Sequence, residues 1–429
     1  ITYGNIKEKL PKDYKFIGDI EFTSYINSYE GNDSYIALNI NVKSNYESNI
    51  ENIKYVYQYD SDNEIIELDV DGAEASDIIE YLLYKSPEEN GLYEPLLPDG
   101  TRTGIRYRGS NPNNYVYFNC EDTYNDISYG EDGYDYENAC EVWRIIGVFD
   151  VDNGKGNVEK RVKLVNTAST FQASWDSSRN VSNDDHVNYG LGINQWGEST
   201  YIDSNGEEQS YEGADLMRLL NGYYIKKSGE TCIYCSQQNQ EICSNDCSDS
   251  LTPLSNISIS MVENILWNLG AIENSNSISL YMAYRSERSK NSGKVCTSGV
   301  YCTDTVIRTS SWLGKVGLIY VSDYGYASAH AVCGQNLVGD TNTCKNNNWM
   351  HLSNGEFWTI TPYIASYIDG GVTAARIHNT SGLDGGIVAA DIMTYDMFVL
   401  PSVYLKTNVT FIGDGNGTED SPYILGINE

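Results

Sequence analysis

The amino-acid sequence predicts an α+β protein in which a β-rich amino-terminal segment precedes a larger, disulfide-braced α+β domain. Residues 141–149 and 161–165 are rich in β-branched and aromatic residues, and an Asp/Asn/Gly-rich turn separates them. This arrangement is a strong β-hairpin signal, and we expect the hairpin to lie at the centre of the larger domain. Helical patterns precede a run of strand patterns in this domain, which is typical of the α+β class.

The first 95 residues predict a separate β-rich segment. Apolar and polar residues largely alternate in three stretches, as in half-buried strands; these are residues 17–23, 35–42 and 53–59. Residues 75–84 predict a short amphipathic helix that begins at a cap formed by Ser76 or Asp77. Residues 86–100 contain three prolines, and we interpret them as the linker between a domain at 1–95 and a domain at 96–429.

The larger domain is predicted to combine short helices with many short strands. An extended pair at 103–109 and 114–120 leads into the central hairpin. Helices are expected at 215–222 and 260–270, because both stretches are apolar at helical spacing and end at a glycine. Trp267 in the second of them is interpreted as a core residue. Six strand-like runs follow, at residues 315–321, 356–361, 371–377, 386–390, 401–405 and 409–412.

Ten cysteines predict an oxidising compartment. They form four groups in the sequence: Cys120 with Cys140; Cys232, Cys235, Cys243 and Cys247; Cys296 with Cys302; and Cys333 with Cys344. Neighbouring cysteines of this kind form disulfides that close loops, and such bonds persist outside the reducing cytosol. The group of four also has a spacing that could hold zinc. We favour two disulfides there, because the other six cysteines already indicate oxidation.

Composition excludes one class of partner. The chain has 429 residues, a formal net charge of −32 and a pI near 4.3, so phosphate backbones and anionic lipid surfaces would be repelled. Nucleic acid is therefore not expected as a partner. Solubility outside the cell is the simplest explanation of the acidity, and cation binding is the alternative. Tyrosine is abundant, with 36 residues, which suits a β-rich protein that exposes aromatic side chains.

No stretch of the sequence carries a catalytic signature, and we predict that the protein is not an enzyme and uses no cofactor or metal. Residues 150–156 resemble a fragment of a calcium loop but lack its later glutamate, so these residues and residues 414–420 are interpreted as hairpin turns. Hydrolase chemistry would need the four histidines to converge in a cleft. They are far apart in the sequence: His186, His330, His351 and His378. A Gly-x-Ser-x-Gly pattern is absent as well.

Five motifs of the larger domain resemble a family of uncharacterised exported proteins of low-GC gut bacteria. They are RYRGSNPNNYVYFNC (106–120), CEVWRIIGVF (140–149), GLIYVSDYGYA (317–327), WTITP (358–362) and PSVYLK (401–406). Members of this family often begin with a prepilin-type hydrophobic leader, which implies export through pilus-type machinery and assembly into a surface filament or pseudopilus. Residues 397–401 depart from the family's usual Gly-Val-Arg-Pro pattern, so its arginine has no counterpart here. The resemblance implies no particular activity.

The end of the chain also resembles C-type-lectin-like domains. A Trp-Thr-x-Thr-Pro strand, a variable hairpin and a closing hydrophobic strand follow one another there, which is a likeness at the level of fold. A lectin-like fold would present a candidate ligand face on the late hairpins, formed by Tyr363, Tyr367, Arg376, His378 and Tyr395. Sugar rings could stack on these aromatic side chains. Ordinary surface packing is the alternative, since tyrosine is abundant throughout the chain.

These features together predict a non-catalytic, extracellular structural subunit of a bacterial surface appendage such as a pilus or filament. We expect the amino-terminal segment to mediate self-association into a polymer, by packing or by adding a strand to a neighbour's sheet. A surface adhesin or lectin that binds glycans or host proteins is the alternative, and a secreted hydrolase is a third hypothesis. No signal peptide and no apolar run of about 18 residues is found, which predicts a mature ectodomain or a processed chain.

Overall fold

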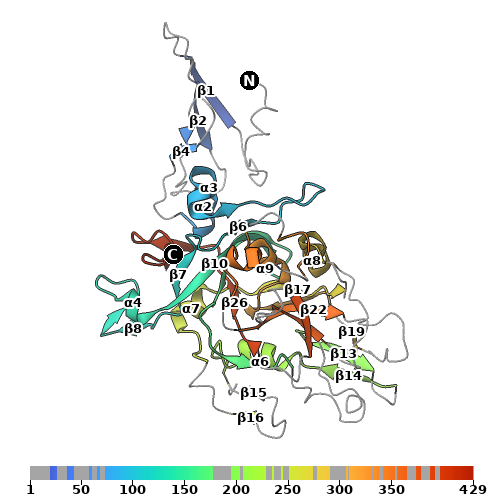
Figure 1. Ribbon diagram of the computed structural model, residues 1–429. Coiled ribbons are helices and arrows are strands. Elements are labelled where there is room, and N and C mark those ends of the chain that lie inside the picture. Colours follow the sequence, from blue (N-terminus) through green and yellow to red (C-terminus); the bar gives the residue numbers. More distant parts are fainter. Residues whose placement is uncertain are drawn as a thin grey trace. The chain divides into compact units, whose positions relative to one another are not determined.

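The structure is a computed structural model in which the chain divides into two compact units, Ile1–Asp71 and Gly72–Glu429 (Figure 1). It describes residues 20–26, 36–42, 58–59, 65–67, 73–176, 195–202, 206–228, 234–235, 243–244, 251–273, 278–289, 306–307, 309–329, 333–337, 342–352, 355–364, 373–377, 387–391 and 397–428. Strands outnumber helices among these residues, and the helices are short. The predicted α+β class is therefore confirmed.

The described residues of the first unit form two antiparallel strand pairs. β1 (Ile20–Ile26) pairs with β2 (Ile36–Val42) along its whole length. β3 (Gln58–Tyr59) pairs with β4 (Ile65–Glu67). The alternation of apolar and polar residues therefore correctly predicted β2 and the first part of β1.

The boundary between the units lies earlier in the chain than the predicted boundary at residue 95. The predicted helix is present as α2 (Ala75–Lys85), but it packs against strands of the second unit and buries Ala75 and Ile79. An amphipathic helix of this length needs a surface on which to bury its apolar face. The second unit provides that surface, so α2 belongs to it.

The stretch expected to be a linker is folded as well. α3 (Pro87–Asn90) begins with its proline, a position at which proline favours a helix. β5 (Leu92–Tyr93) follows and pairs with residues 106 and 107. The N-cap of α2 also differs from the prediction, because Glu74 occupies it instead of Ser76 or Asp77. Pro87 therefore begins a helix, and the stretch does not separate two domains.

The central hairpin is present as predicted. β10 (Glu141–Asp152) pairs with β11 (Val158–Val165), with a bulge between Ile145 and Gly147. The hairpin lies inside a seven-stranded sheet of order β21–β26–β11–β10–β6–β5, in which β7 also pairs with β10. The other strands of this sheet are β6 (Ile105–Tyr107), β7 (Tyr115–Phe118), β21 (Val316–Gly317) and β26 (Ser402–Tyr404).

A six-stranded sheet has the order β12–β25–β22–β23–β24, with β18 beside β22. Its strands are β12 (Gln172–Ala173), β18 (Ile272–Glu273), β22 (Phe357–Ile364), β23 (Thr373–Ile377), β24 (Ile387–Asp391) and β25 (Met397–Phe398). Three predicted strands correspond closely to β22, β23 and β24. One smaller sheet has three strands, with β13 (Ser199–Ile202) between β14 (Glu208–Tyr211) and β19 (Val306–Ile307). The others are pairs of strands: β8 (Thr123–Tyr124) with β9 (Ile127–Ser128), and β15 (Tyr234–Cys235) with β16 (Cys243–Ser244). Two further pairs are β17 (Ile265–Asn268) with β20 (Ser311–Gly314), and β27 (Val409–Ile412) with β28 (Ile424–Ile427).

One predicted helix is present and one is wrong. α6 (Asp215–Asn221) lies at the predicted position. The helix expected at 260–270 is replaced by α7 (Asn256–Met261) and strand β17, which places Trp267 opposite Trp312 of β20. Short apolar runs do not distinguish a helix from a buried strand, and pairing with β20 decided the outcome here.

The remaining described helices are α4 (Tyr136–Ala139), α8 (Leu280–Glu287), α9 (Val321–Tyr326) and α10 (Asn342–Asn346). Within the described ranges, no helix has both the length and the apolar character needed to cross a membrane.

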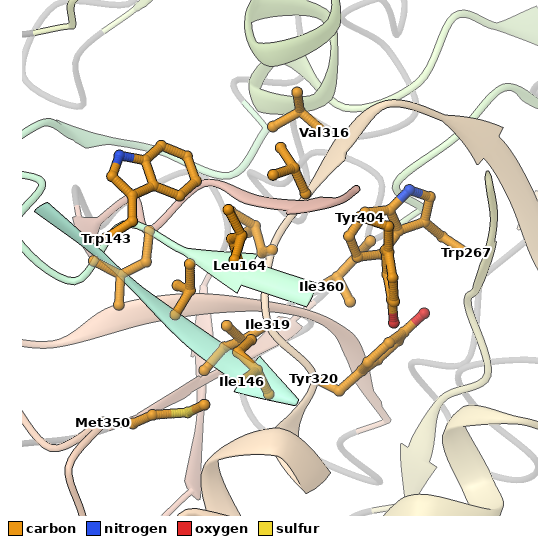
Figure 2. Close-up of a cluster of buried hydrophobic side chains, with 14 of the residues drawn as sticks. Trp143, Ile146, Leu164, Trp267, Val316, Ile319, Tyr320, Met350, Ile360 and Tyr404 are labelled. Atoms are coloured by element: carbon orange, nitrogen blue, oxygen red, sulfur yellow. The ribbon is translucent and has the colours of Figure 1, made fainter. Parts of the chain in front are cut away.

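The hydrophobic core of the second unit surrounds the central hairpin. Trp143 and Leu164 from the two hairpin strands are fully buried, and Ile319 and Ile360 lie in the same cluster (Figure 2). Trp267 is fully buried too, so its predicted role as a core residue is confirmed. Figure 2 shows Trp267, Tyr404 and Tyr320 gathered at one end of the cluster. These three large aromatic side chains therefore enclose that end of the core.

Two of the predicted disulfides are present, Cys120–Cys140 and Cys333–Cys344. Cys235 and Cys243 occupy opposite positions on β15 and β16. The other four cysteines lie outside the described residues; they are Cys232, Cys247, Cys296 and Cys302. Disulfides persist outside the reducing cytosol, so the two bonds indicate an oxidising compartment.

Replacing Cys120 and Cys140 by serine is expected to lower the free energy of unfolding by about 3 kcal/mol, because the bond restricts the unfolded chain. The two cysteines are 20 residues apart, and the loop between them has its own small core of Tyr134 and Ala139. Urea denaturation followed by tryptophan fluorescence measures the change. An unfolding midpoint equal to that of the unmodified chain would contradict this prediction.

Candidate functional site

Four charged side chains are buried together inside the second unit, although charged residues are rarely buried without partners. Arg106 comes from β6, Lys163 from β11, Glu287 from the end of α8 and Asp323 from α9. Each of them is at most 1% exposed. We call these four residues the buried charge cluster. It joins four elements that are far apart in the sequence.

Asp323 is the centre of this cluster. Its Oδ1 accepts a hydrogen bond of 2.9 Å from a terminal guanidinium nitrogen of Arg106, and its Oδ2 accepts one of 2.6 Å from Lys163 Nζ. The backbone N–H of Tyr320 also donates to Oδ2, at 3.1 Å. This last bond fixes the carboxylate at the first turn of α9. One carboxylate therefore faces two cations in a site that water does not reach.

Aromatic rings surround both cations. Lys163 Nζ lies 4.3 Å from the ring centre of Tyr320, 5.1 Å from that of Trp267 and 5.3 Å from that of Tyr404. The guanidinium of Arg106 lies 4.5 Å and 4.4 Å from the ring centres of Phe149 and Tyr326. Such contacts stabilise a cation through the quadrupole of the ring. They also keep the site apolar around its charges.

Glu287 holds the start of α9 in place. Its Oε1 accepts hydrogen bonds from the backbone N–H of Ser322 at 3.0 Å and from Thr361 Oγ1 at 3.1 Å. Its Oε2 accepts one from Ser322 Oγ at 2.5 Å and lies 3.3 Å from a guanidinium nitrogen of Arg288. Because Ser322 precedes Asp323, these bonds also set the position of the Asp323 carboxylate.

The charges of the cluster shift one another's pKa values. Burial alone would raise the pKa of Asp323, but Lys163 and Arg106 lower it well below the usual value through their charges and hydrogen bonds. Burial lowers the pKa of Lys163 to about 8, and the attraction of Asp323 only partly opposes this. Burial raises the pKa of Glu287. With Arg288 included, three cations face two carboxylates, so the group carries one excess positive charge when every member is ionised.

This cluster was not predicted from the sequence. Lys163 stands between Val162 and Leu164, and in a strand with one solvated face such alternation would place the lysine in water. Residues 161–165 are instead all buried, since β11 lies inside the sheet with both faces covered. Arg106 and Asp323 lie within motifs of the family resemblance, which was the one available signal for them.

The candidate ligand face is only partly described. Tyr363 lies in β22 opposite Thr373, and Arg376 lies in the neighbouring strand β23 opposite Trp358. Tyr367, His378 and Tyr395 lie outside the described residues. The structure therefore places the two described residues of this set, Tyr363 and Arg376, on adjacent strands.

The two acidic stretches that resemble calcium loops are turns. Asp152 Oδ1 accepts hydrogen bonds from the backbone N–H groups of Gly154 and Gly156, at 2.8 and 3.0 Å, so it caps the turn of the central hairpin. Residues 414–420 lie in the connection between β27 and β28. Within the described part of the chain, no group of three or more His, Cys, Asp and Glu residues is placed to hold a metal ion.

Of the four histidines, only His351 lies within the described residues. Its Nδ1 lies 3.3 Å from the hydroxyl of Tyr324, and burial lowers its pKa. His186, His330 and His378 lie outside the described ranges.

Comparison with known proteins found no matching protein-family model, no matching curated protein and no matching solved structure. The functional conclusions below therefore rest on the sequence and the structure of this chain.

Proposed function

We propose that the protein is a non-catalytic structural subunit of an extracellular bacterial appendage, and that copies of it associate through the first unit. The observation that carries this proposal is the pattern of the β1–β2 hairpin. Ile20, Phe22 and Ile26 lie opposite Val42, Ile40 and Ile36. Residues at alternate positions share one face, so these six apolar residues lie on the same face of the hairpin.

The other face of the hairpin has a different composition. Thr23 lies opposite Asn39 and Glu21 opposite Asn41, so this face is largely polar. A two-stranded hairpin is at best marginally stable in water unless its apolar face is covered. A second copy of the same hairpin offers a face of matching chemistry, and face-to-face packing of two such hairpins would bury both apolar faces.

The second unit suits a subunit that is exposed outside the cell. Two disulfides constrain it, and the buried charge cluster ties the central hairpin to α8 and α9. Such constraints favour resistance to unfolding where chaperones are absent. In this proposal the second unit is the body of each subunit, and its net negative charge keeps unassembled chains soluble.

A pair of matched variants tests the proposed contact. Ile40→Asp places a charge on the apolar face of the hairpin, and Asn41→Asp places the same charge on the next residue, on the polar face. Burying an unpaired carboxylate is costly, so we expect Ile40→Asp to weaken self-association at least tenfold and Asn41→Asp to change it little. Sedimentation velocity of the full chain over a range of concentrations, with electron microscopy of the same samples, measures the effect.

Three results would overturn the proposal. The first is a wild-type chain that stays monomeric at high concentration. The second is equal association of the two variants. The third is loss of association in Asn41→Asp alone, since that would place the contact on the polar face.

A further inference from the structure

We propose that Lys163 and Asp323 become joined by an intramolecular isopeptide bond after the chain folds, with the loss of one water molecule. Lys163 Nζ lies 2.6 Å from Asp323 Oδ2, and both side chains are at most 1% exposed. The bond would link β11 of the central hairpin to α9, across 160 residues of sequence. This inference does not depend on the proposed function, because it concerns the second unit alone.

The fold holds the two reacting groups together. Lys163 is fixed on a strand that pairs with β10 on one side and β26 on the other. Asp323 is fixed by the backbone N–H of Tyr320 and, through Ser322, by Glu287. Two groups fixed at this separation react as if each were present at a very high concentration, which removes much of the entropic barrier to a condensation.

The surroundings of Lys163 favour the form of the amine that reacts. The rings of Trp267, Tyr320 and Tyr404 enclose Nζ and exclude water from it, and this loss of hydration disfavours charge on the ammonium group despite the attraction of the ring faces. Burial lowers the pKa of Lys163 to about 8, so the uncharged amine is accessible near neutral pH.

The condensation is balanced without an oxidant or any other reactant. First, one proton moves from Nζ to Oδ2 along their hydrogen bond, which converts the ion pair into an amine and a carboxylic acid. The nitrogen lone pair then attacks Cγ and forms the new C–N bond. A second proton passes from nitrogen to Oδ2, the Cγ–Oδ2 bond breaks, and water leaves. The product is an amide that keeps one N–H and the carbonyl oxygen Oδ1.

Arg106 acts on two stages of this reaction in opposite directions. Its charge stabilises the Asp323 carboxylate, which opposes the first proton transfer. During attack, negative charge develops on Oδ1, and the Arg106 N–H that already donates to Oδ1 at 2.9 Å stabilises that charge. After the reaction, the same N–H donates to the amide carbonyl. Arg106 is therefore a catalytic residue for this step, because it touches a reacting atom.

Mass spectrometry of the full chain tests the proposal. After reduction and denaturation, we expect the wild-type mass to be lower than the sequence mass by about 18 Da, the mass of one water molecule. Trypsin cannot cleave after a modified Lys163. The digest should therefore contain a branched peptide that joins residues 162–179 to residues 316–345.

Two variants separate this bond from other losses of water, such as cyclisation at an Asp-Gly sequence. Lys163→Arg keeps a positive charge but removes the reactive amine, so the deficit and the branched peptide should both disappear. Asp323→Asn would release ammonia instead of water, and any deficit should then be about 17 Da. A wild-type chain of full sequence mass overturns the proposal even if neither variant folds. A deficit that persists in Lys163→Arg overturns it too.

Discussion

The free energy of unfolding is expected to fall by about 3–5 kcal/mol when Asp323 is replaced by alanine, which is the usual cost of removing one partner from a buried ion pair. Asp323 is the carboxylate shared by Arg106 and Lys163, and both cations are at most 1% exposed. The variant would leave two buried positive charges without their shared counter-ion, and it would also remove the proposed Lys163–Asp323 bond wherever that bond has formed. It also removes the acceptor for the Tyr320 N–H at the start of α9.

Asp132→Ala provides the matched control. Asp132 is exposed in the loop between Cys120 and Cys140, so the same change of side chain occurs there in water. We expect the control to change the free energy of unfolding by less than about 0.5 kcal/mol. Urea denaturation followed by tryptophan fluorescence compares the two. Equal stability of Asp323→Ala and Asp132→Ala would show that Asp323 does not hold the second unit together.

Local sequence pattern predicted the elements whose structure is decided locally. The central hairpin was found because its strands and its turn are adjacent in the chain, and the turn residues themselves bond to Asp152. The disulfides Cys120–Cys140 and Cys333–Cys344 were found for the same reason, since each closes a short loop. In both cases the partners are separated by few residues, so sequence proximity is a sound guide.

Elements that depend on distant partners were predicted less well. Residues 265–268 have an apolar spacing that also fits a helix, and only pairing with β20 makes them a strand. The helix α2 was assigned to the wrong unit, because nothing in its own sequence says which surface covers Ile79. In both cases tertiary contacts decide the structure, and local propensity does not.

The buried charge cluster shows the same limit most clearly. A charged residue in an alternating strand is normally expected in water, and the expectation fails only when both faces of the strand are covered. Lys163 and Asp323 are in contact although 160 residues separate them in the sequence, and 217 residues separate Arg106 from Asp323. No pattern within one segment reveals such a meeting. A lysine and an arginine within apolar strands were the only local hints.

Replacing Trp267 by alanine is expected to cost about 3–5 kcal/mol of unfolding free energy, the usual range for a buried tryptophan. Its ring is fully buried, its Nε1 donates to the carbonyl of Gly314 at 3.0 Å, and its ring centre lies 5.1 Å from that of Tyr404. The backbone of Gly317 lies so close that an added Cβ would come within 2.8 Å of the ring. Neighbouring side chains therefore cannot fill the space without moving a strand.

The loss of Trp267 would also remove one ring from the surroundings of Lys163 Nζ. Leu313→Ala on the neighbouring strand β20 is the control, because Leu313 is 45% exposed and its truncation leaves no closed cavity. We expect it to cost less than about 1 kcal/mol by the same denaturation measurement. If the two variants were equally stable, the aromatic end of the core would not be a rigid enclosure.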